Sequence, residues 1–216
     1  MQPEKIYLGS TESRIQQYRV DSQKYWDKGD AENALKYRDS IKAVIVNTYI
    51  KEHRFTALNG SAFETANQDN PMFLQVTASW CVPCRAEIPA LNQIAEKYQD
   101  QVDFVLLFQD PADRLTTLSK EYNPTITLVP SNKVVSDPNT IDIAGFRHTM
   151  GFPSTYLITP ENQVINFTQG AQAPRTYTGE DGKEVIITQD EANRQNFARL
   201  EAEIKDLLQK SAVHNL

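Results

Sequence analysis

The stretch that decides the fold is residues 72–89, which read MFLQVTASWCVPCRAEIP and carry two cysteines three positions apart. Residues 72–77 have the composition of a short strand, and residues 87–98 have the periodicity of a helix. A second strand-like run at residues 102–108 completes a strand, helix, strand unit, which implies two parallel strands. The cysteines therefore fall where the first strand turns into the helix.

Cys81 and Cys84 occupy a position that suits redox chemistry. A thiolate at a helix N-terminus faces unpaired N–H groups and the positive end of the helix dipole, which lower its pKa from about 8.5 toward about 3.5 to 7.5. We therefore predict that Cys81 is the nucleophile. Cys84, one turn further on, can attack a mixed disulfide on Cys81 and release the substrate in reduced form. Pro83 fits the first helical turn, where a missing N–H costs nothing, and together with Trp80 it favours an exposed turn.

Three other interpretations of the cysteine pair are open. A zinc site would need a second pair of ligands, and the three histidines are scattered without paired spacing, at His53, His148 and His214. A purely structural disulfide would close so small a loop that it would remove little chain entropy. The third alternative is a pair of buried, inert thiols. His148 is expected to be a surface residue without a role.

Composition and charge exclude several classes of function. The chain has 216 residues, with 28 acidic and 22 basic side chains and a net charge of -6. Phosphate binding needs clustered positive charge, so we expect no nucleic-acid partner. No apolar run approaches the roughly 20 residues that span a bilayer. The N-terminus lacks the apolar core of a secretion signal, so either the protein is cytoplasmic or a signal has been removed.

The first part of the chain is predicted to be helical. Apolar side chains recur at three- and four-residue steps, at Tyr37, Ile41, Val44, Ile45, Thr48 and Tyr49. An earlier helical stretch, which carries Ile15, Tyr18, Tyr25 and Trp26, ends at Lys28-Gly29-Asp30. Glycine suits a helix end and aspartate the start of the next helix, so these residues predict a helical hairpin. Its apolar stripes are expected to pack on the core, with association or partner binding as the alternative.

The rest of the chain alternates between strands and helices. A helix over 112–121 and a strand at 125–129 are expected, followed by an antiparallel pair at 154–159 and 163–167 around a turn at residues 160–162. A less distinct hairpin is expected at 175–188, around residues 180–182. The final helical stripe, which would cover one face of the sheet, consists of Phe197, Leu200, Ile204, Leu207 and Leu208.

Residues 73–89, FLQVTASWCVPCRAEIP, resemble the TlpA/ResA-like branch of the thioredoxin superfamily. About 70 residues downstream, Gly151-Phe-Pro-Ser-Thr-Tyr-Leu-Ile158 is similar to the Gly-x-Pro-Thr-Thr strand entry of that family. The resemblance covers residues 55–170 and, less strongly, the final helix. It implies that Pro153 is a cis-proline packed against the cysteine pair, with an ordinary trans turn as the alternative. It also implies that the backbone of Phe152 pairs with a bound substrate strand. The expected substrate contacts are Phe152 and the two residues beside the cysteines, Trp80 and Pro83.

The same resemblance places an acidic residue three positions after the second cysteine, and here that residue is Glu87. Positions i and i+3 share a helix face, so its carboxylate could take up the proton of Cys84. The alternative is a first-turn acid that only complements the helix dipole. Ordinary thioredoxins carry a buried aspartate six positions before the first cysteine. Gln75 occupies that position here and cannot carry a proton, so Glu87 is the better candidate.

These patterns predict an α/β, thioredoxin-like fold, with a central mixed β-sheet flanked by helices, in residues 54–216. An N-terminal helical extension in residues 1–53 precedes it. The expected function is thiol-disulfide oxidoreductase, most simply a reductase of protein disulfides. Alternatives are a disulfide oxidase or isomerase and a non-catalytic thioredoxin-like binding module. No G-x-G-x-x-G pattern is present, and neither cofactor nor metal is expected. The resemblance implies protein thiol or disulfide clients, a membrane dithiol electron donor, a periplasmic or other extracytoplasmic location, and a role in cytochrome c maturation or envelope redox balance.

Overall fold

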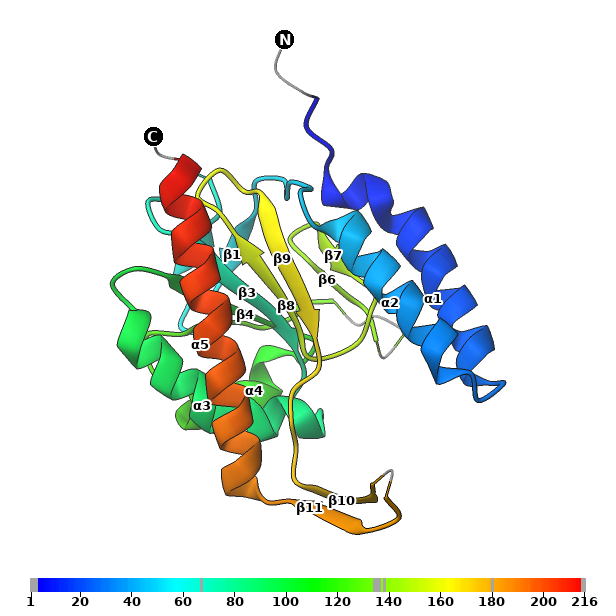
Figure 1. The fold of residues 1–216 in the computed structure, drawn as a ribbon. Helices are drawn as coiled ribbons and strands as arrows, with labels where there is room; N and C mark the ends of the chain where they lie inside the picture. Colours follow the sequence, from blue (N-terminus) through cyan, green and yellow to red (C-terminus); the bar gives the residue numbers. More distant parts are fainter. Residues whose placement is uncertain (1–3, 67, 134–136, 138, 180, 215–216) are drawn as a thin grey trace.

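The computed structural model describes residues 4–66, 68–133, 137, 139–179 and 181–214, and Figure 1 shows how they are arranged. A five-stranded sheet with the order β5-β4-β3-β8-β9 lies at the centre. Its strands are β3 (Met72–Thr77), β4 (Asp103–Phe108), β5 (Thr127–Val129), β8 (Ser154–Ile158) and β9 (Val164–Gln169). β3, β4 and β5 are parallel, whereas β8 runs antiparallel to β3 and β9 antiparallel to β8. This mixed sheet confirms the predicted thioredoxin-like α/β fold.

The central strand β3 is buried at all six positions, as expected for a strand that is covered on both faces. Successive side chains point to opposite faces, so Phe73 enters one hydrophobic cluster and Leu74 the other. Gln75 shares the face of Phe73. The predicted strand at 72–77 is therefore correct. One of its side chains, the amide of Gln75, is polar and lies inside the core.

Three helices cover the face to which Phe73 points (Figure 1): α3 (Val82–Tyr98), α4 (Ala112–Leu118) and α5 (Gln189–His214). Their contribution to that cluster includes Leu91, Ile94, Leu115, Leu200, Ile204 and Leu207. The C-terminal stripe thus packs as predicted. The helix expected over 112–121 is divided, because α4 is followed by a 3-10 turn, η2 (Ser119–Glu121).

The N-terminal segment forms a short 3-10 turn, η1 (Leu8–Thr11), and two helices, α1 (Glu12–Trp26) and α2 (Ala31–Ile45). Gly29 lies between the helices with a φ of 73°, and the Asp30 side chain accepts a hydrogen bond from the Asn33 N–H. The helical hairpin is therefore present. Ile15, Ile41 and Ile45 belong to the same cluster as Leu74, so the hairpin packs on the second face of the sheet. The structure does not test 53/54 as a domain boundary, which stays a prediction.

The apolar stripe of the second helix was predicted to reach Tyr49, and this was wrong at its end. α2 ends at Ile45, since Asn47 takes a φ of 69° that no helix allows. The Asn47 N–H donates to the Val164 carbonyl (2.7 Å), and the Val164 N–H donates to the Thr48 carbonyl (2.8 Å). The end of the extension is therefore hydrogen-bonded to the edge strand β9.

Three small antiparallel hairpins surround this core: β1 (Arg54–Thr56) with β2 (Ala62–Glu64), β6 (Ile141–Ile143) with β7 (Phe146–His148), and β10 (Arg175–Thr178) with β11 (Glu184–Ile187). Only the last was predicted, and Glu180 in its turn lies outside the described residues. The other two have strands of three residues, too short for alternation to be read. The β6–β7 turn has Ala144 and Gly145 at φ 49° and 82°, as a two-residue hairpin turn requires.

β5 begins at Thr127 rather than at residue 125, because the Asn123 side chain accepts hydrogen bonds from the Thr125 N–H and hydroxyl and holds a turn there.

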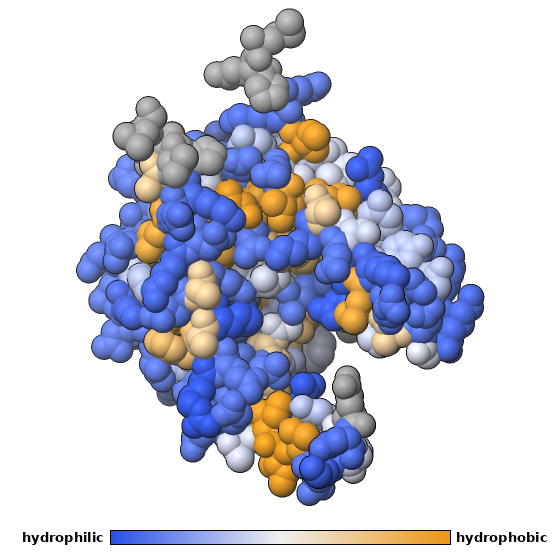
Figure 2. Space-filling model, viewed as in Figure 1, coloured by the Kyte–Doolittle hydropathy of each residue, from blue (hydrophilic) through white to orange (hydrophobic). Residues whose placement is uncertain are grey.

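The face in Figure 2 is mostly hydrophilic, with an apolar patch over the β10–β11 hairpin, where Ile186 is exposed. Among the described residues, no helix is long and apolar enough to cross a membrane.

Candidate active site

Cys81 and Cys84 lie at the start of α3, directly after the loop that follows β3. Cys81 is the N-cap residue, and its sulfur accepts a hydrogen bond from the Cys84 N–H (3.3 Å). The two sulfurs form a disulfide, with the Cα atoms 5.2 Å apart. Pro83 lies in the first turn of the helix, where it removes no intrahelical hydrogen bond. The sulfur of Cys81 thus lies at the positive end of the α3 dipole.

The surface around the pair is apolar. Each cysteine is only 4% exposed, whereas Trp80 is 55% and Val82 68% exposed. The expected exposed turn is therefore made by the residues beside the cysteines rather than by the cysteines themselves. The Trp80 indole N–H donates to the Gln109 side chain (3.1 Å), which holds the ring beside the pair.

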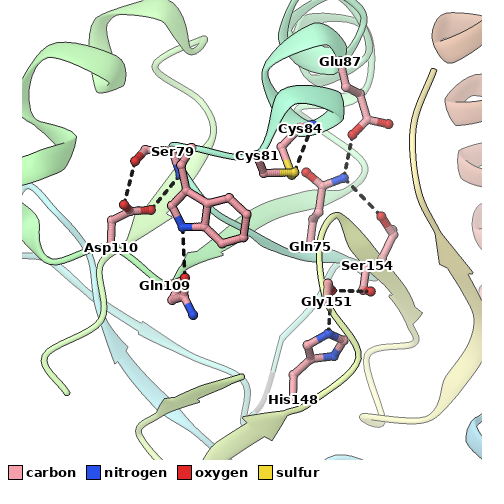
Figure 3. The surroundings of a disulfide bond; sticks show 12 residues. Gln75, Ser79, Cys81, Cys84, Glu87, Gln109, Asp110, His148, Gly151 and Ser154 are labelled. Carbon is pink, nitrogen blue, oxygen red and sulfur yellow. Dashed lines mark hydrogen bonds between the residues drawn. A yellow bond between two sulfur atoms is a disulfide. The ribbon is translucent and has the colours of Figure 1, made fainter. Parts of the chain in front are cut away.

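Asp110, at the end of β4, fixes the loop before Cys81 (Figure 3). Its two carboxylate oxygens accept from the Ser79 N–H (2.7 Å) and the Ser79 hydroxyl (2.6 Å). The carboxyl ends of the parallel strands β3 and β4 meet at one edge of the sheet, so this bond positions the turn into α3. Asp110 was not predicted, although its place two residues after the strand predicted at 102–108 is the signal that could have identified it.

Phe152, which directly precedes Pro153, lies against the cysteine pair. The Phe152–Pro153 peptide bond is cis. The Phe152 ring packs against Cys81 and Cys84 and meets the Trp80 ring edge to face, with centroids 5.9 Å apart. Two separate segments of the chain thus bring their aromatic rings together beside the cysteine pair.

His148 lies against Phe152 and is only 1% exposed, so the expectation of a surface residue was wrong. Its ring stacks on Phe152, its Nε2–H donates to the Gly151 carbonyl (2.9 Å), and its Nδ1 accepts from the Tyr156 hydroxyl (2.8 Å). Burial lowers the pKa of His148 to about 4, so the ring is neutral near pH 7. The β6–β7 hairpin, which was not predicted, is what carries His148 into the core.

Glu87 lies one turn beyond Cys84 on α3 and is fully buried. Its Oε2 accepts from the Gln75 side-chain amide (2.9 Å), which also donates to the Thr155 hydroxyl (3.2 Å). Its Oε1 accepts from the guanidinium of Arg199 on α5. Figure 3 shows the Gln75 side chain between the cysteine pair and Glu87 in that view. The carboxylate is therefore held by β3 and α5 inside the core, and it is not a solvated acid of the first helical turn.

Burial raises the pKa of Glu87 to about 7, although the charge of Arg199 and the hydrogen bond from Gln75 act in the opposite direction. A carboxyl group with such a pKa exists in both protonation states near pH 7. It can therefore both accept and return a proton in that range.

Neither cysteine has a set of neighbouring metal ligands. In the part of the chain that the structure describes, no three His, Cys, Asp or Glu side chains cluster as a metal site would require. His53 and His148 both use ring nitrogens on backbone carbonyls, of Ala144 and Gly151 respectively. The side chain of His214 lies outside the described residues.

A mixed sheet in this order, with a redox-capable cysteine pair where its central strand meets the next helix, defines the class as thiol-disulfide oxidoreductases of thioredoxin-like fold. The family described as Thioredoxin matches residues 54–150. A thioredoxin-like protein of Synechocystis sp. is 36% identical over 73 residues, which cover 33% of this chain and 67% of that protein. This chain belongs to the thioredoxin family.

Two further relatives and one solved structure are similar to parts of this chain. Thioredoxin H2 of Arabidopsis thaliana is 37% identical over 76 residues, covering 33% of this chain and 54% of that protein. Thiol-disulfide oxidoreductase ResA of Bacillus thuringiensis subsp. konkukian is 27% identical over 124 residues, covering 54% and 65%. The matches thus span 54% to 67% of these relatives' lengths. A solved thio-disulfide isomerase from Thermus thermophilus is 24% identical, covers 59% of this chain and 88% of its own, and has a TM-score of 0.44. The presence of ResA is consistent with the TlpA/ResA-like branch that the sequence resembles.

Proposed function

We propose that this protein reduces disulfide bonds of other proteins by thiol-disulfide exchange at Cys81 and Cys84. The observation that carries the proposal is the pairing of this dithiol site with Glu87, a buried carboxyl group one helical turn away. Such a group can take the proton of Cys84 when that thiol has to become a nucleophile. Trp80, Pro83 and the backbone of Phe152 are the proposed client contacts.

The reaction begins with the reduced pair. The Cys81 thiolate, stabilised by the start of α3, attacks one sulfur of the client disulfide. A mixed disulfide forms between Cys81 and the client, and the other client sulfur leaves as a thiolate.

The second step resolves the mixed disulfide. Cys84 gives its proton to the Glu87 carboxylate, and the resulting thiolate attacks the sulfur of Cys81. The client's second sulfur leaves as a thiolate, and Cys81 and Cys84 are left as a disulfide. Two electrons have passed from the cysteine pair to the client, whose thiolates take up protons from Glu87 and water.

The oxidised pair then needs a reductant. In keeping with the TlpA/ResA-like resemblance, we propose a membrane dithiol protein as electron donor, an extracytoplasmic location, and clients such as those of cytochrome c maturation. Fractionation of the source cells tests the location, since a protein that stays with the cytoplasmic fraction would contradict it.

The deciding experiment is the reduction potential of the pair, measured by equilibration in defined thiol-disulfide buffers. A value at or below about -250 mV, near that of thioredoxin, supports a reductase. A value above about -180 mV would replace it with an oxidase or isomerase. A pair that does not exchange with the buffer at all would leave only the binding module.

A further inference from the structure

Arg199 reaches the candidate site from α5, more than 100 residues after the cysteines. Its guanidinium donates to Oε1 of Glu87 through one nitrogen and to Oε1 of Glu203 through another, the second bond being 2.8 Å long. The side chain of Arg199 is 29% exposed, and those of Glu87 and Glu203 are 1% and 8% exposed. Two carboxylates therefore share one cation in the interface between α3 and α5.

This arrangement leaves a negative charge that the cation does not balance. Oε2 of Glu87 is satisfied by Gln75, whereas Oε2 of Glu203 is buried and has no hydrogen-bond partner among the described residues. Charges interact strongly in a buried site because water screens them weakly. Arg199 therefore favours the ionised form of Glu87, and Glu203 opposes it, as the directions of their effects on the pKa of Glu87 indicate.

We propose that Arg199 is a positioning residue for the thiol chemistry, which holds the Glu87 carboxylate toward Gln75 and divides its own charge between Glu87 and Glu203. The negative charge of Glu203 then offsets part of the effect of Arg199, so that Glu87 can still change its protonation state near neutral pH. The inference rests on the proposed function, in which Glu87 takes the proton of Cys84. It adds two residues of α5, Arg199 and Glu203, which lie outside the Thioredoxin match at residues 54–150.

The other groups around Glu87 do not supply this control. Gln75 and Thr155 are uncharged, and the cysteines do not titrate in the oxidised state. Tyr122 lies near enough to interact with the charge of Glu87, but burial raises the pKa of Tyr122, so it stays neutral through the range in which Glu87 titrates. Charge at this place comes from Arg199 and Glu203.

A second ion pair between α3 and α5 provides a matched control. Lys97, in the last turn of α3, pairs with Glu201 on α5, and the lysine side chain is 51% exposed. Lys97→Met therefore removes a cation that also links these helices but lies at the far end of α3 from the cysteines. It should reproduce any general loosening of the interface without acting on Glu87.

The test is to titrate the side-chain carboxyl of Glu87 by carbon NMR in the oxidised protein, with the resonance assigned from its loss in Glu87→Gln. Arg199→Met should move the Glu87 midpoint up by at least about one pH unit, the usual effect of a close opposite charge. Glu203→Gln should move the Glu87 midpoint down, because the positive charge of Arg199 then acts on Glu87 without a second carboxylate beside it. Lys97→Met should leave it unchanged. Two variants that shift Glu87 in opposite directions cannot be explained by a common loss of packing.

The inference is overturned if Arg199→Met and Glu203→Gln move the midpoint in the same direction, or by no more than Lys97→Met does. Should Arg199→Met fail to fold, Glu203→Gln and Arg199→Lys decide. Lysine keeps the charge but not the fork, so a small upward shift is expected for Arg199→Lys and none would contradict the positioning role. The titration needs no redox partner, so it gives a result even where the reduction potential is too high for a reductase or the pair fails to exchange with thiol buffers, which are the outcomes that would end the proposed function.

Discussion

The amide of Gln75 donates a hydrogen bond to the carboxylate of Glu87 across 2.9 Å, from the centre of β3 to the second turn of α3. Gln75 stands six positions before Cys81, where ordinary thioredoxins carry an acid. Here the buried acid near the cysteines, Glu87, lies on the helix instead, and the strand supplies a neutral amide that donates to it. Since the same amide also bonds to Thr155, its position is fixed by β8 as well.

Replacing Gln75 by Leu should raise the pKa of Glu87 and lower the free energy of unfolding. Loss of the donor removes one interaction that favours the carboxylate, and it leaves the buried Thr155 hydroxyl without this partner. The expected cost is about 1 to 3 kcal/mol, measured by urea unfolding of the oxidised protein. Thr155→Val is the control, because it removes the weaker Gln75 bond and leaves the one to Glu87. An unchanged Glu87 titration in Gln75→Leu would show that the amide does not tune the acid.

Glu87→Gln should change how stability depends on pH. The pKa of Glu87 is raised by burial from 4.5 to about 7, so its contribution to stability is fully present below about pH 4.5 and is lost as pH rises through 7. Relative to Glu87→Gln, the wild-type protein should lose about 3 kcal/mol of unfolding free energy between pH 4 and pH 8. Urea unfolding of oxidised samples across this range measures it. Glu96→Gln, an exposed acid on the same helix, should run parallel to the wild type.

Much of the fold and of the site follows from short sequence patterns. The strand at 72–77, the helix dipole at Cys81 and the one-turn spacing to Glu87 depend on neighbours in the chain, which the sequence shows directly. The roles of Arg199 and Asp110 depend on contacts between segments that are 112 and 31 residues apart. No local periodicity carries that information, because any exposed helix face has arginines and glutamates.

His148 illustrates a second kind of failure. Histidine is intermediate between the residue types that are usually buried and those that are usually exposed, so a lone histidine does not by itself indicate burial. The tight Ala144-Gly145 turn folds β7 back on β6 and turns His148 inward, where a tyrosine hydroxyl and a backbone carbonyl satisfy its ring nitrogens. Three-residue strands leave too little alternation for the sequence to indicate which side is buried.

His148→Phe should remove a pH dependence of stability that is opposite in sign to the one expected from Glu87. Burial depresses the pKa of His148 from 6.5 to about 4, so its contribution to stability is present above pH 6.5 and is lost as pH falls through 4. The wild type should therefore lose about 3 kcal/mol over that interval relative to the variant. Tyr156→Phe should keep this dependence while losing about 1 kcal/mol for one hydrogen bond. Thermal unfolding at pH 4, 5, 6 and 7 separates the two, and a variant that follows the wild-type profile would refute the assignment.

Trp80→Ala should weaken client binding without changing the redox poise. The ring is exposed beside the pair and held by Gln109 and Phe152, as a contact residue for a protein client would be. We expect the KM for a protein disulfide to rise about tenfold, which corresponds to a loss of about 1.4 kcal/mol. The reduction potential should stay at the wild-type value. Trp26→Ala, at the end of α1, serves as the control, and an equal rise in KM there would argue against a specific contact.

The helical hairpin should prove inseparable from the sheet, although residues 1–53 were expected as an extension. Ile45 of α2 is fully buried in the cluster that contains Leu74, so Ile45→Ala should cost about 2 to 5 kcal/mol of unfolding free energy. Leu35, which is exposed on the same helix, gives the control, and Leu35→Ala should change stability by no more than about 0.5 kcal/mol.

The sharper test of the hairpin is its removal. A chain of residues 54–216 would uncover apolar residues of the same cluster, such as Phe55 and Ile141, and the start of the edge strand β9, where Val164 now bonds to Asn47 and Thr48. An uncovered edge strand next to apolar surface is a site of aggregation. We therefore expect the truncated chain to be insoluble or to unfold without cooperativity, as judged by gel filtration and urea unfolding. A monomeric truncated chain that unfolds cooperatively and keeps the reduction potential of the full protein would instead make residues 54–216 an independent domain, and the helices would then be free to serve a partner.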